Sequence, residues 1–480
     1  MDKKLIIIGA GVSGLSCGIM AQKYGFKTTI FEKNNFAGGN LTGWYRKGCY
    51  IDNCLHWLNG SKSGTNLNSL WKELGAIDSN TDFYQSEYFY ESELGKHRVG
   101  LNKDLEITKN EMLKVSPNDA KQINKFISAV KKCRTLISGN KIGQITSLVS
   151  LGIKYGRKTI GDVAKMFISP LLQRFLSDYI LPEYSIYVLL FAYASFTLGD
   201  GMVLRSGSKS MADKMIKKYN ELGGKLVLSS GVKSVVTNVK RATGVILDDN
   251  KFVDADYVVC ATDTNITFNK LLDKSLTPLH LKSTYKNRRK YPIISSFHIA
   301  YKVNNSANNK FDSLIFETMK PIKIGNTFYN RIMIKSYDYA DTFTKDDSYI
   351  LQVFLLQRER DYDYFASLSS EDYNKEKKRI TEEVTNALLI KFQNLKENIE
   401  HLDTWTPYTY TKYFDAYKGS YMSFGITNSI RLGKIKNRIG KYKNLFLASQ
   451  WQSLFGGLPN AARNGKECAE MILKTETNNI

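Results

Sequence analysis

LIIIGAGVSGLSCG, residues 5–18, is the stretch that decides the fold. Its apolar start is typical of a buried parallel strand, and glycines follow at once at positions 9, 11 and 14. In a strand, turn and helix unit, Gly9 permits the tight turn, Gly11 lets the backbone approach a pyrophosphate, and Gly14 lets the helix pack closely on the strand. The pattern predicts a dinucleotide phosphate at the helix N-terminus, in contact also with Ala10 and Ser13.

A second strand candidate, KTTIFEK (residues 27–33), ends in Glu32 and Lys33. Glu32 stands eighteen residues after Gly14, where a carboxylate accepts the hydroxyls of an adenosine ribose and repels a 2'-phosphate. A glycine pair follows in FEKNNFAGGNLTGW, and it predicts a second backbone turn against the same dinucleotide. We expect this turn to contact the ligand through Gly38, Gly39, Asn40, Leu41 and Thr42.

An acidic strand end followed by a glycine pair resembles the large FAD-binding oxidoreductase superfamily that includes amine oxidases and phytoene desaturases. The resemblance favours FAD over NAD as the bound cofactor. It also implies that Val232, at the start of a later strand, meets the adenine through its backbone, and that the loop Ala261 to Asp263 lies near the nucleotide.

The C-terminal stretch KNLFLASQWQSLFGGLPNAARNGKECAEMIL is typical of a strand, a glycine pair and a helix. Pro459 suits the first helical position, where its missing N–H costs nothing. A reduced flavin carries negative charge near its pyrimidine ring, and a helix N-terminus would stabilise that charge. We therefore expect Gly456, Gly457, Leu458 and Pro459 to face the flavin.

The sequence predicts an α/β protein in two parts. A Rossmann-like FAD-binding domain is assembled from residues 1–95, 205–274 and 416–480. Residues 96–204 and 275–415 form an α+β substrate domain with a mixed sheet, and its apolar helical part lies at about 145–200. The most apolar run there, IYVLLFAYASFTL, has thirteen residues and is too short to span a bilayer.

Five separate stretches, among them FEKNNFAGGNLTGWYRKGCYIDNCLHWLNGS, SGSKSMADKM and DAYKGSYMSFGIT, look like the bacterial branch related to phytoene desaturase, carotenoid isomerase and retinol saturase. By this resemblance DNCLHWL returns the chain beside the isoalloxazine. His56 is then the candidate proton donor or acceptor, because histidine ordinarily titrates near neutral pH. Trp57 and Trp451 either wall the flavin pocket or belong to the core.

The composition limits which classes of binding partner the chain could have. The formal charge of +22 fits a lysine-rich surface, an anionic membrane or nucleic acid, although no nucleic-acid-binding module accompanies the basic clusters. Six scattered cysteines indicate reduced thiols, and five histidines without close spacing predict no metal. With no signal peptide expected, these features predict a cytoplasmic protein, with peripheral contact to the inner membrane face as a further option.

The apolar insert favours an extended hydrophobic substrate such as a polyene, isoprenoid or fatty-acyl chain, and so predicts C–C desaturation or C=C reduction. Flavin-dependent isomerisation of a polyene is the close alternative. An amine oxidase, a flavin-dependent sugar mutase, which shares Asn40, and a basic nucleic-acid-binding flavoprotein are the other hypotheses. The sequence leaves the substrate, the direction of electron flow and the oligomeric state open.

Overall fold

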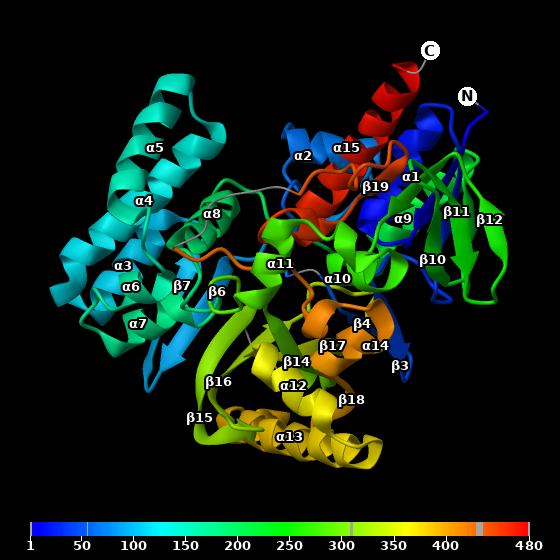
Figure 1. The fold of residues 1–480 in the computed structure, drawn as a ribbon. Coiled ribbons are helices and arrows are strands. Elements are labelled where there is room, and N and C mark those ends of the chain that lie inside the picture. The colour runs from blue at the N-terminus through cyan, green and yellow to red at the C-terminus, as the bar shows by residue number, and fades with distance from the viewer. Residues whose placement is uncertain (1, 55, 308–310, 429–434, 479–480) are drawn as a thin grey trace.

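The computed structural model describes residues 2–54, 56–307, 311–428 and 435–478. Two sheets and a group of helices organise these residues, and the two chain ends lie near each other at one end of the molecule (Figure 1).

A five-stranded parallel sheet forms the first part, in the order β19-β13-β1-β2-β9. Its strands come from three distant parts of the chain: β1 (Lys4–Ile8), β2 (Lys27–Phe31), β9 (Lys225–Val227), β13 (Tyr257–Cys260) and β19 (Leu445–Leu447). Leu5 to Ile8 of β1 are all buried, as a parallel strand covered on both faces requires. The sequence-predicted Rossmann-like sheet of discontinuous segments is confirmed.

Alternate residues of β1 face two different cores. Leu5 and Ile7 pack under helices α1 (Val12–Lys23), α9 (Gly207–Glu221) and α15 (Gly457–Thr477), with α2 (Asn66–Glu73) beside them. Ile6 and Ile8 pack under the antiparallel meander of β10 (Val232–Thr237), β11 (Ala242–Leu247) and β12 (Phe252–Asp254). This alternation follows from the two-residue period of a strand.

Glycines, which have no side chain, let the helices of the first part pack close together. A Cβ on Gly14 would lie 2.0 Å from the Gly9 carbonyl oxygen, and one on Gly465 of α15 would lie 2.4 Å from the Ser13 oxygen of α1. A Cβ on Gly18 would lie 2.8 Å from the Tyr219 ring of α9. The glycines of the opening motif therefore fix how α1 packs against both of its neighbours.

A seven-stranded mixed sheet forms the second part, in the order β18-β14-β17-β16-β15-β6-β7. Its strands are β6 (Tyr88–Leu94), β7 (His97–Asn102), β14 (Ser295–Asn304), β15 (Ser313–Ile324), β16 (Thr327–Ser336), β17 (Ser348–Gln357) and β18 (Ile399–Trp405). Only β15 and β6 pair in parallel among these described strands. Helix α13 (Ser370–Lys391) packs on this sheet, and its N-cap is Ser369, whose side chain accepts from the Asp372 N–H.

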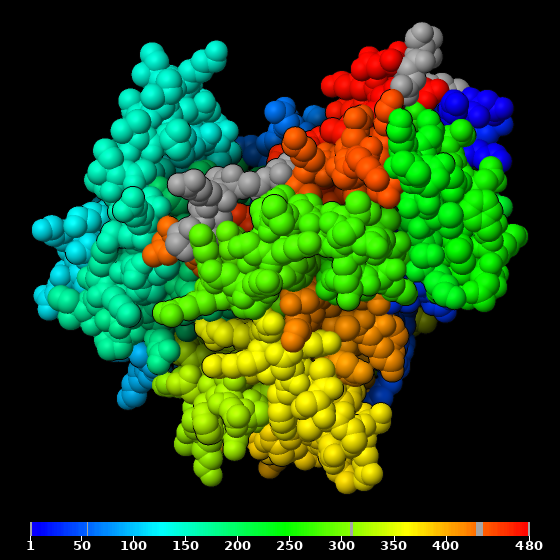
Figure 2. Space-filling view, viewed as in Figure 1, coloured from blue at the N-terminus to red at the C-terminus, as the bar shows by residue number. Residues whose placement is uncertain are grey.

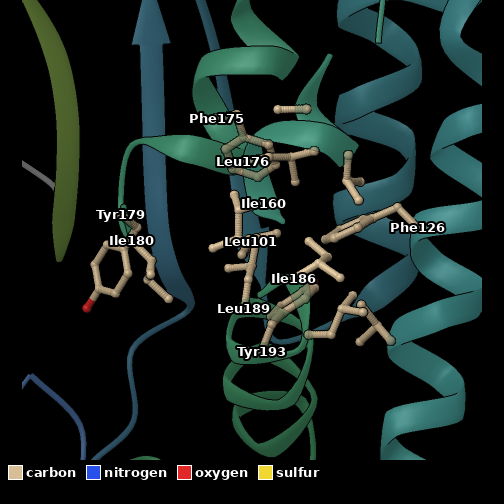
Figure 3. Close-up of a cluster of buried hydrophobic side chains, with 14 of the residues drawn as sticks. Leu101, Phe126, Ile160, Phe175, Leu176, Tyr179, Ile180, Ile186, Leu189 and Tyr193 are labelled. Atoms are coloured by element: carbon tan, nitrogen blue, oxygen red, sulfur yellow. The ribbon is translucent and has the colours of Figure 1, made fainter. Parts of the chain in front are cut away.

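Helices α3 to α8 form one group that begins well before the apolar helical part expected at about 145–200. They are α3 (Leu105–Val115), α4 (Ala120–Ser138), α5 (Lys141–Tyr155), α6 (Ile160–Ala164), α7 (Pro170–Ser177) and α8 (Ile186–Thr197). Their buried side chains share one core, which includes Phe126 of α4 and Leu189 and Tyr193 of α8 (Figure 3). No helix in the described residues is both long enough and apolar enough to cross a membrane.

Shorter elements connect these parts. They are β3 (Gly43–Arg46), β4 (Cys49–Asp52), β5 (Phe83–Tyr84), β8 (Val203–Leu204), α10 (Thr264–Ile266), α11 (Leu279–Lys286), α12 (Glu359–Ser367) and α14 (Pro407–Phe414).

Two sequence predictions are wrong in detail. Residues 88–95 were assigned to the nucleotide domain, but β6 pairs with β15 in the second sheet, because its Leu314↔Glu91 register continues that sheet. Pro459 is the third residue of α15 and not the first, because the helix begins at Gly457 with Gly456 as its N-cap. The missing proline N–H still falls in the first turn, where no intrahelical partner exists.

Candidate functional site

Two glycine turns meet at the carboxyl end of β1. The Gly38 N–H donates to the Ala10 carbonyl over 2.9 Å. A Cβ on Gly39 would lie 3.2 Å from the Gly11 Cα, whereas a Cβ on Gly11 would meet no heavy atom within 4 Å. The turns thus pack on each other and leave open space beside Gly11, as the approach of a pyrophosphate requires.

Glu32 lies at the end of β2, next to the first turn. Its carboxylate is 8% exposed and accepts hydrogen bonds from the Ala10 N–H (2.9 Å) and the Asn34 N–H (3.0 Å). The Ser230 N–H donates to the Glu32 carbonyl, which brings the start of β10 at Val232 beside it. The structure therefore brings together the two residues proposed for the ribose and the adenine.

The N-terminus of α15 completes this edge of the site. Gly456 and Gly457 have positive φ angles of 54° and 81°, and the Gly457 N–H donates to the Gln450 Oε1 over 2.8 Å. Among the described residues the Leu458 N–H has no partner, and Pro459 has no N–H to offer. The Leu458 N–H therefore remains available to a ligand.

Asn40 carries a second unused polar group. Its Oδ1 is buried without a hydrogen-bond partner in the described part of the chain, while its carbonyl accepts from the Asn53 Nδ2 over 3.4 Å. An unsatisfied buried acceptor is costly unless a ligand pairs with it. Together with the open space at Gly11 and the free Leu458 N–H, this donor and acceptor set fits a flavin dinucleotide.

Residues 52–54 and 56–58 are fixed from three sides. The Asp52 carboxylate accepts from the Ser208 hydroxyl over 2.6 Å, at the start of α9. The Gln352 side chain of β17 donates to the Asp52 carbonyl over 2.7 Å, and the Lys335 ammonium of β16 donates to the His56 carbonyl over 3.0 Å. Both parts of the fold thus hold this segment in place.

His56 does not have the near-neutral pKa that we expected. Burial, with a smaller contribution from the Lys335 charge, lowers the pKa of its imidazole to about 3. Its ring contacts Phe354 at a centroid distance of 4.8 Å. The side chain is therefore neutral at physiological pH, and it can act as a weak base or as a hydrogen-bonding group but not as an imidazolium acid.

A second buried histidine lies next to it and was not singled out from the sequence. His298 of β14 stacks on Trp405 at 4.7 Å, and its Nε2 contacts the Ser296 hydroxyl and the Tyr410 hydroxyl of α14, the latter at 3.2 Å. Its Nδ1 is buried without a partner among the described residues. Burial, and then the proximity of His56, lowers the pKa of His298 well below its ordinary value.

The polar cluster of His298 and Tyr410 is connected to the second glycine turn. The Tyr410 hydroxyl donates to the Asn53 Oδ1 over 3.2 Å, and Asn53 in turn bonds to Asn40. The strand sequence SSFHIAYKV gave little signal, because Ser296 and His298 lie on the face opposite to the apolar Phe297, Ile299, Tyr301 and Val303. Tyr410 had no such signal, because its partners lie far away in the sequence.

Aromatic side chains line the other side of the 52–58 segment. Trp57 contacts Phe89 at 5.0 Å and Tyr179 at 5.7 Å, and all three belong to or pack against the apolar helical core. Phe354 contacts both histidines. Trp57 is half-buried, whereas Phe89, Tyr179 and Phe354 are buried, and none of these four side chains carries a charge.

The remaining predicted residues fall into two groups. Some lie at the turns: Ser13 in the first turn of α1, Ala261 beside Gly9, and Thr42, whose carbonyl accepts from Asn53. Others hold the scaffold. Leu41 and Trp451 lie in buried cores, Lys33 pairs with Asp415 over 2.8 Å, and half-buried Asp263 accepts from the Asn265 and Tyr417 N–H groups.

Comparison with known proteins gives the family of this chain. A family model described as flavin containing amine oxidoreductase matches residues 12–473. The phytoene desaturase of Fusarium fujikuroi is 25% identical and aligns with 99% of this chain and 90% of its own length. The chloroplastic prolycopene isomerase of Daucus carota is 21% identical over 87% of this chain and 71% of its own.

A solved structure supports the fold. Wild-type putrescine oxidase, bound to putrescine, superposes with a TM-score of 0.62 at 14% identity and covers 99% of each chain. At this identity the likeness concerns the fold alone.

Lys335 gives the site a pH-dependent stability. Burial lowers the pKa of its ammonium from 10.5 to about 8, against the opposing pull of Asp52 and Asp312. Between these values the unfolded chain binds the proton and the folded chain does not, so stability rises with pH from 8 to 10.5. In the wild type, the free energy of unfolding should therefore rise by up to ~3 kcal/mol over this pH range, and Lys335→Met should remove this rise. Urea unfolding of the FAD-loaded proteins measures it.

Lys320→Met, at an exposed position of β15, is the matched control and should leave the pH profile unchanged. A Lys335→Met protein whose stability follows the wild-type pH profile across this window would contradict the assignment.

Proposed function

Because the chain belongs to the flavin-containing amine oxidoreductase family, we infer that it transfers hydride between FAD and an extended hydrophobic substrate. The chain is a FAD-dependent oxidoreductase. Within that class we propose C–C desaturation, or C=C reduction in the reverse direction, of a polyene, isoprenoid or fatty-acyl-like molecule. The phytoene desaturase and prolycopene isomerase relatives support a polyene.

The observation that carries the proposal is the group of uncharged aromatic rings around His56 and Trp57. Trp57, Phe89, Tyr179 and Phe354 offer rings, and both histidines are neutral. An apolar chain gains free energy by burying its surface here, at roughly 25 cal/mol per Å². A cationic amine would find no carboxylate among these residues and would have only the faces of the rings to compensate for its loss of water.

Bound FAD supplies a ring that accepts a hydride and returns it. The protein has to hold the substrate carbon against that ring and exclude water. The turn amides, Glu32 and the Leu458 N–H would hold the cofactor, and the aromatic rings would align the substrate.

A desaturation also removes a proton from the neighbouring carbon. When hydride departs, that C–H becomes strongly acidic, so a base of low pKa is sufficient to accept its proton. We propose that the neutral imidazole of His56 is this base, with the Lys335 ammonium and its hydrogen bond to the His56 carbonyl as the group that positions it. The buried cluster of His298 and Tyr410 keeps the neighbouring wall neutral.

Polyene isomerisation is the second candidate function, and the prolycopene isomerase relative favours it. An isomerase would return the hydride or proton to the same substrate and would leave the FAD redox state unchanged after each turnover. Product geometry without net flavin oxidation separates the two reactions.

A hydrophobic substrate dissolves in membranes, so we propose that the protein reaches it by peripheral contact with an anionic bilayer on the cytoplasmic side. The charge of +22 supports this contact by long-range attraction. A nucleic-acid partner is not part of the proposal, because the sequence contains no recognised binding module.

The substrate class can be tested with photoreduced enzyme under anaerobic conditions. We expect polyenes, enones or fatty-acyl compounds with a C=C bond to reoxidise the flavin, since they accept the hydride. Stopped-flow absorbance of the flavin measures the rate. Inertness toward every apolar compound, together with rapid reduction of the oxidised enzyme by an amine and release of peroxide, would sink the proposal in favour of an amine oxidase.

The role of His56 can be tested by His56→Leu. Loss of a positioned base should lower turnover by about 10²- to 10⁴-fold, while the FAD content stays that of the wild type. His97→Leu, on the exposed end of β7, is the control. Unchanged turnover in His56→Leu would show that another group takes the proton.

A further inference from the structure

Residues 120–161 form a segment without a single acidic residue between Asp119 and Asp162. The segment includes α4 and α5, which stand out from the body as a helical arm (Figures 1 and 2). Nine basic residues lie in it: Lys121, Lys125, Lys131, Lys132, Arg134, Lys141, Lys154, Arg157 and Lys158. Within the described part of the chain, only Lys131 of these nine forms an ion pair, with Glu106 at 2.9 Å.

Helix α5 is apolar on the side that faces away from the protein. Ser147, Leu151 and Tyr155 are buried and form its inner face. The outer face exposes five large aliphatic side chains: Ile142 (77%), Ile145 (63%), Leu148 (63%), Val149 (56%) and Ile153 (82%). Exposed aliphatic residues on successive turns of one helix mark a contact surface, because leaving them in water costs free energy.

A groove of about 190 Å³ lies between α4 and α5, and its α5 side is formed by the inner-face residues Leu151 and Tyr155 and by Lys154, which follows the exposed Ile153 in the helix. Lys125, Lys132 and Lys154 line it, together with Ser128 and Tyr155. Lys132 donates to the Ser150 hydroxyl, and the groove has no acidic lining residue among those described. Three ammonium groups around one small groove suit an anionic headgroup.

We propose that α5 and the lysines of this groove form the surface by which the protein docks on an anionic lipid bilayer. The aliphatic side chains of α5 enter the boundary between headgroups and acyl chains, and the lysines bind the lipid phosphates. The inference rests on the proposed function, because it names the membrane partner of a site that takes a hydrophobic substrate.

Charge decides against a second copy of this chain as the occupant. A two-fold symmetric contact brings the same patch of each copy together, so it would oppose two acid-free segments of nine basic residues each. The outer face of α5 is also convex and aliphatic, which suits insertion into lipid better than binding to the phosphates of a nucleic acid.

The arm is connected to the candidate site through one apolar core. Phe126 of α4 and Tyr193 of α8 belong to it (Figure 3), and Trp57 of the site packs against the same core. Docking through α5 would therefore hold the aromatic surface of the site at a fixed orientation relative to the bilayer.

The test is flotation of the FAD-loaded protein with vesicles of equal parts phosphatidylglycerol and phosphatidylcholine, and with vesicles of phosphatidylcholine alone. We expect binding to the anionic vesicles only, and weaker binding as salt is added. Ile145→Asp combined with Val149→Asp should weaken this binding by about tenfold or more, because two buried aliphatic contacts are lost. Lys125→Gln, Lys132→Gln and Lys154→Gln together should weaken it similarly.

Val239→Asp is the matched control. Val239 is 75% exposed, like the α5 residues, but lies in the hairpin between β10 and β11 at the other end of the molecule. The Val239→Asp protein should bind the anionic vesicles as strongly as the wild type does.

Full vesicle binding by both the aspartate and the glutamine variants, or equal binding to neutral vesicles, would overturn the docking surface. So would a concentration-dependent dimer that the aspartate variant abolishes, or tight binding of duplex DNA that the glutamine variant abolishes.

Activity assays with detergent-solubilised substrate distinguish failure of the docking surface from failure of the proposed function. A protein that turns over this substrate without binding vesicles contradicts the docking surface alone, and one that binds vesicles but reacts with no apolar compound contradicts the proposed function alone.

Discussion

The hydrogen bond from the Gly38 N–H to the Ala10 carbonyl holds two glycine turns together, and the rest of the site depends on it. The two turns lie so close together that a Cβ on Gly39 would be 3.2 Å from the Gly11 Cα. From there the chain of contacts continues through Asn40 to Asn53, and through the Tyr410 hydroxyl to His298. The nucleotide edge of one sheet and the buried wall of the other are thus parts of a single hydrogen-bonded arrangement, so that a shift in the turns would move the histidines as well.

The burial of two histidines is the second constraint on the site. His56 and His298 are neutral because they are desolvated, and the Lys335 ammonium beside them lowers the His56 pKa further. The aromatic rings of this wall carry no carboxylate, so they match an apolar chain and a reaction in which hydride moves to a flavin. On the surface, α5 exposes aliphatic side chains whose burial needs a nonaqueous partner. The lysines of the groove between α4 and α5 favour a partner that is anionic.

Local patterns in the sequence predicted the parts of the fold that are themselves local. The β1 and α1 unit, the strand ending in Glu32 and the glycine pair at the start of α15 each follow from neighbouring residues. Pairings over long sequence distances could not be predicted in this way. Tyr410 reaches Asn53, Gln352 reaches Asp52 and β6 joins β15 only because the fold brings them together, so the polar cluster was missed and one domain boundary was misplaced. The His56 pKa was also misjudged, since burial is a property of the folded chain.

The central claim is that the glycine turns, Glu32 and the start of α15 bind one FAD. The most direct measurement is the flavin content of the purified protein, with the cofactor released by denaturation and identified by its mass. The account predicts one FAD per wild-type chain and a markedly weaker affinity in Glu32→Lys, because a cation at the end of β2 cannot accept the ribose hydroxyls. A wild-type protein that takes up no flavin even when FAD is added, or a Glu32→Lys protein that binds FAD as tightly as the wild type, would contradict it.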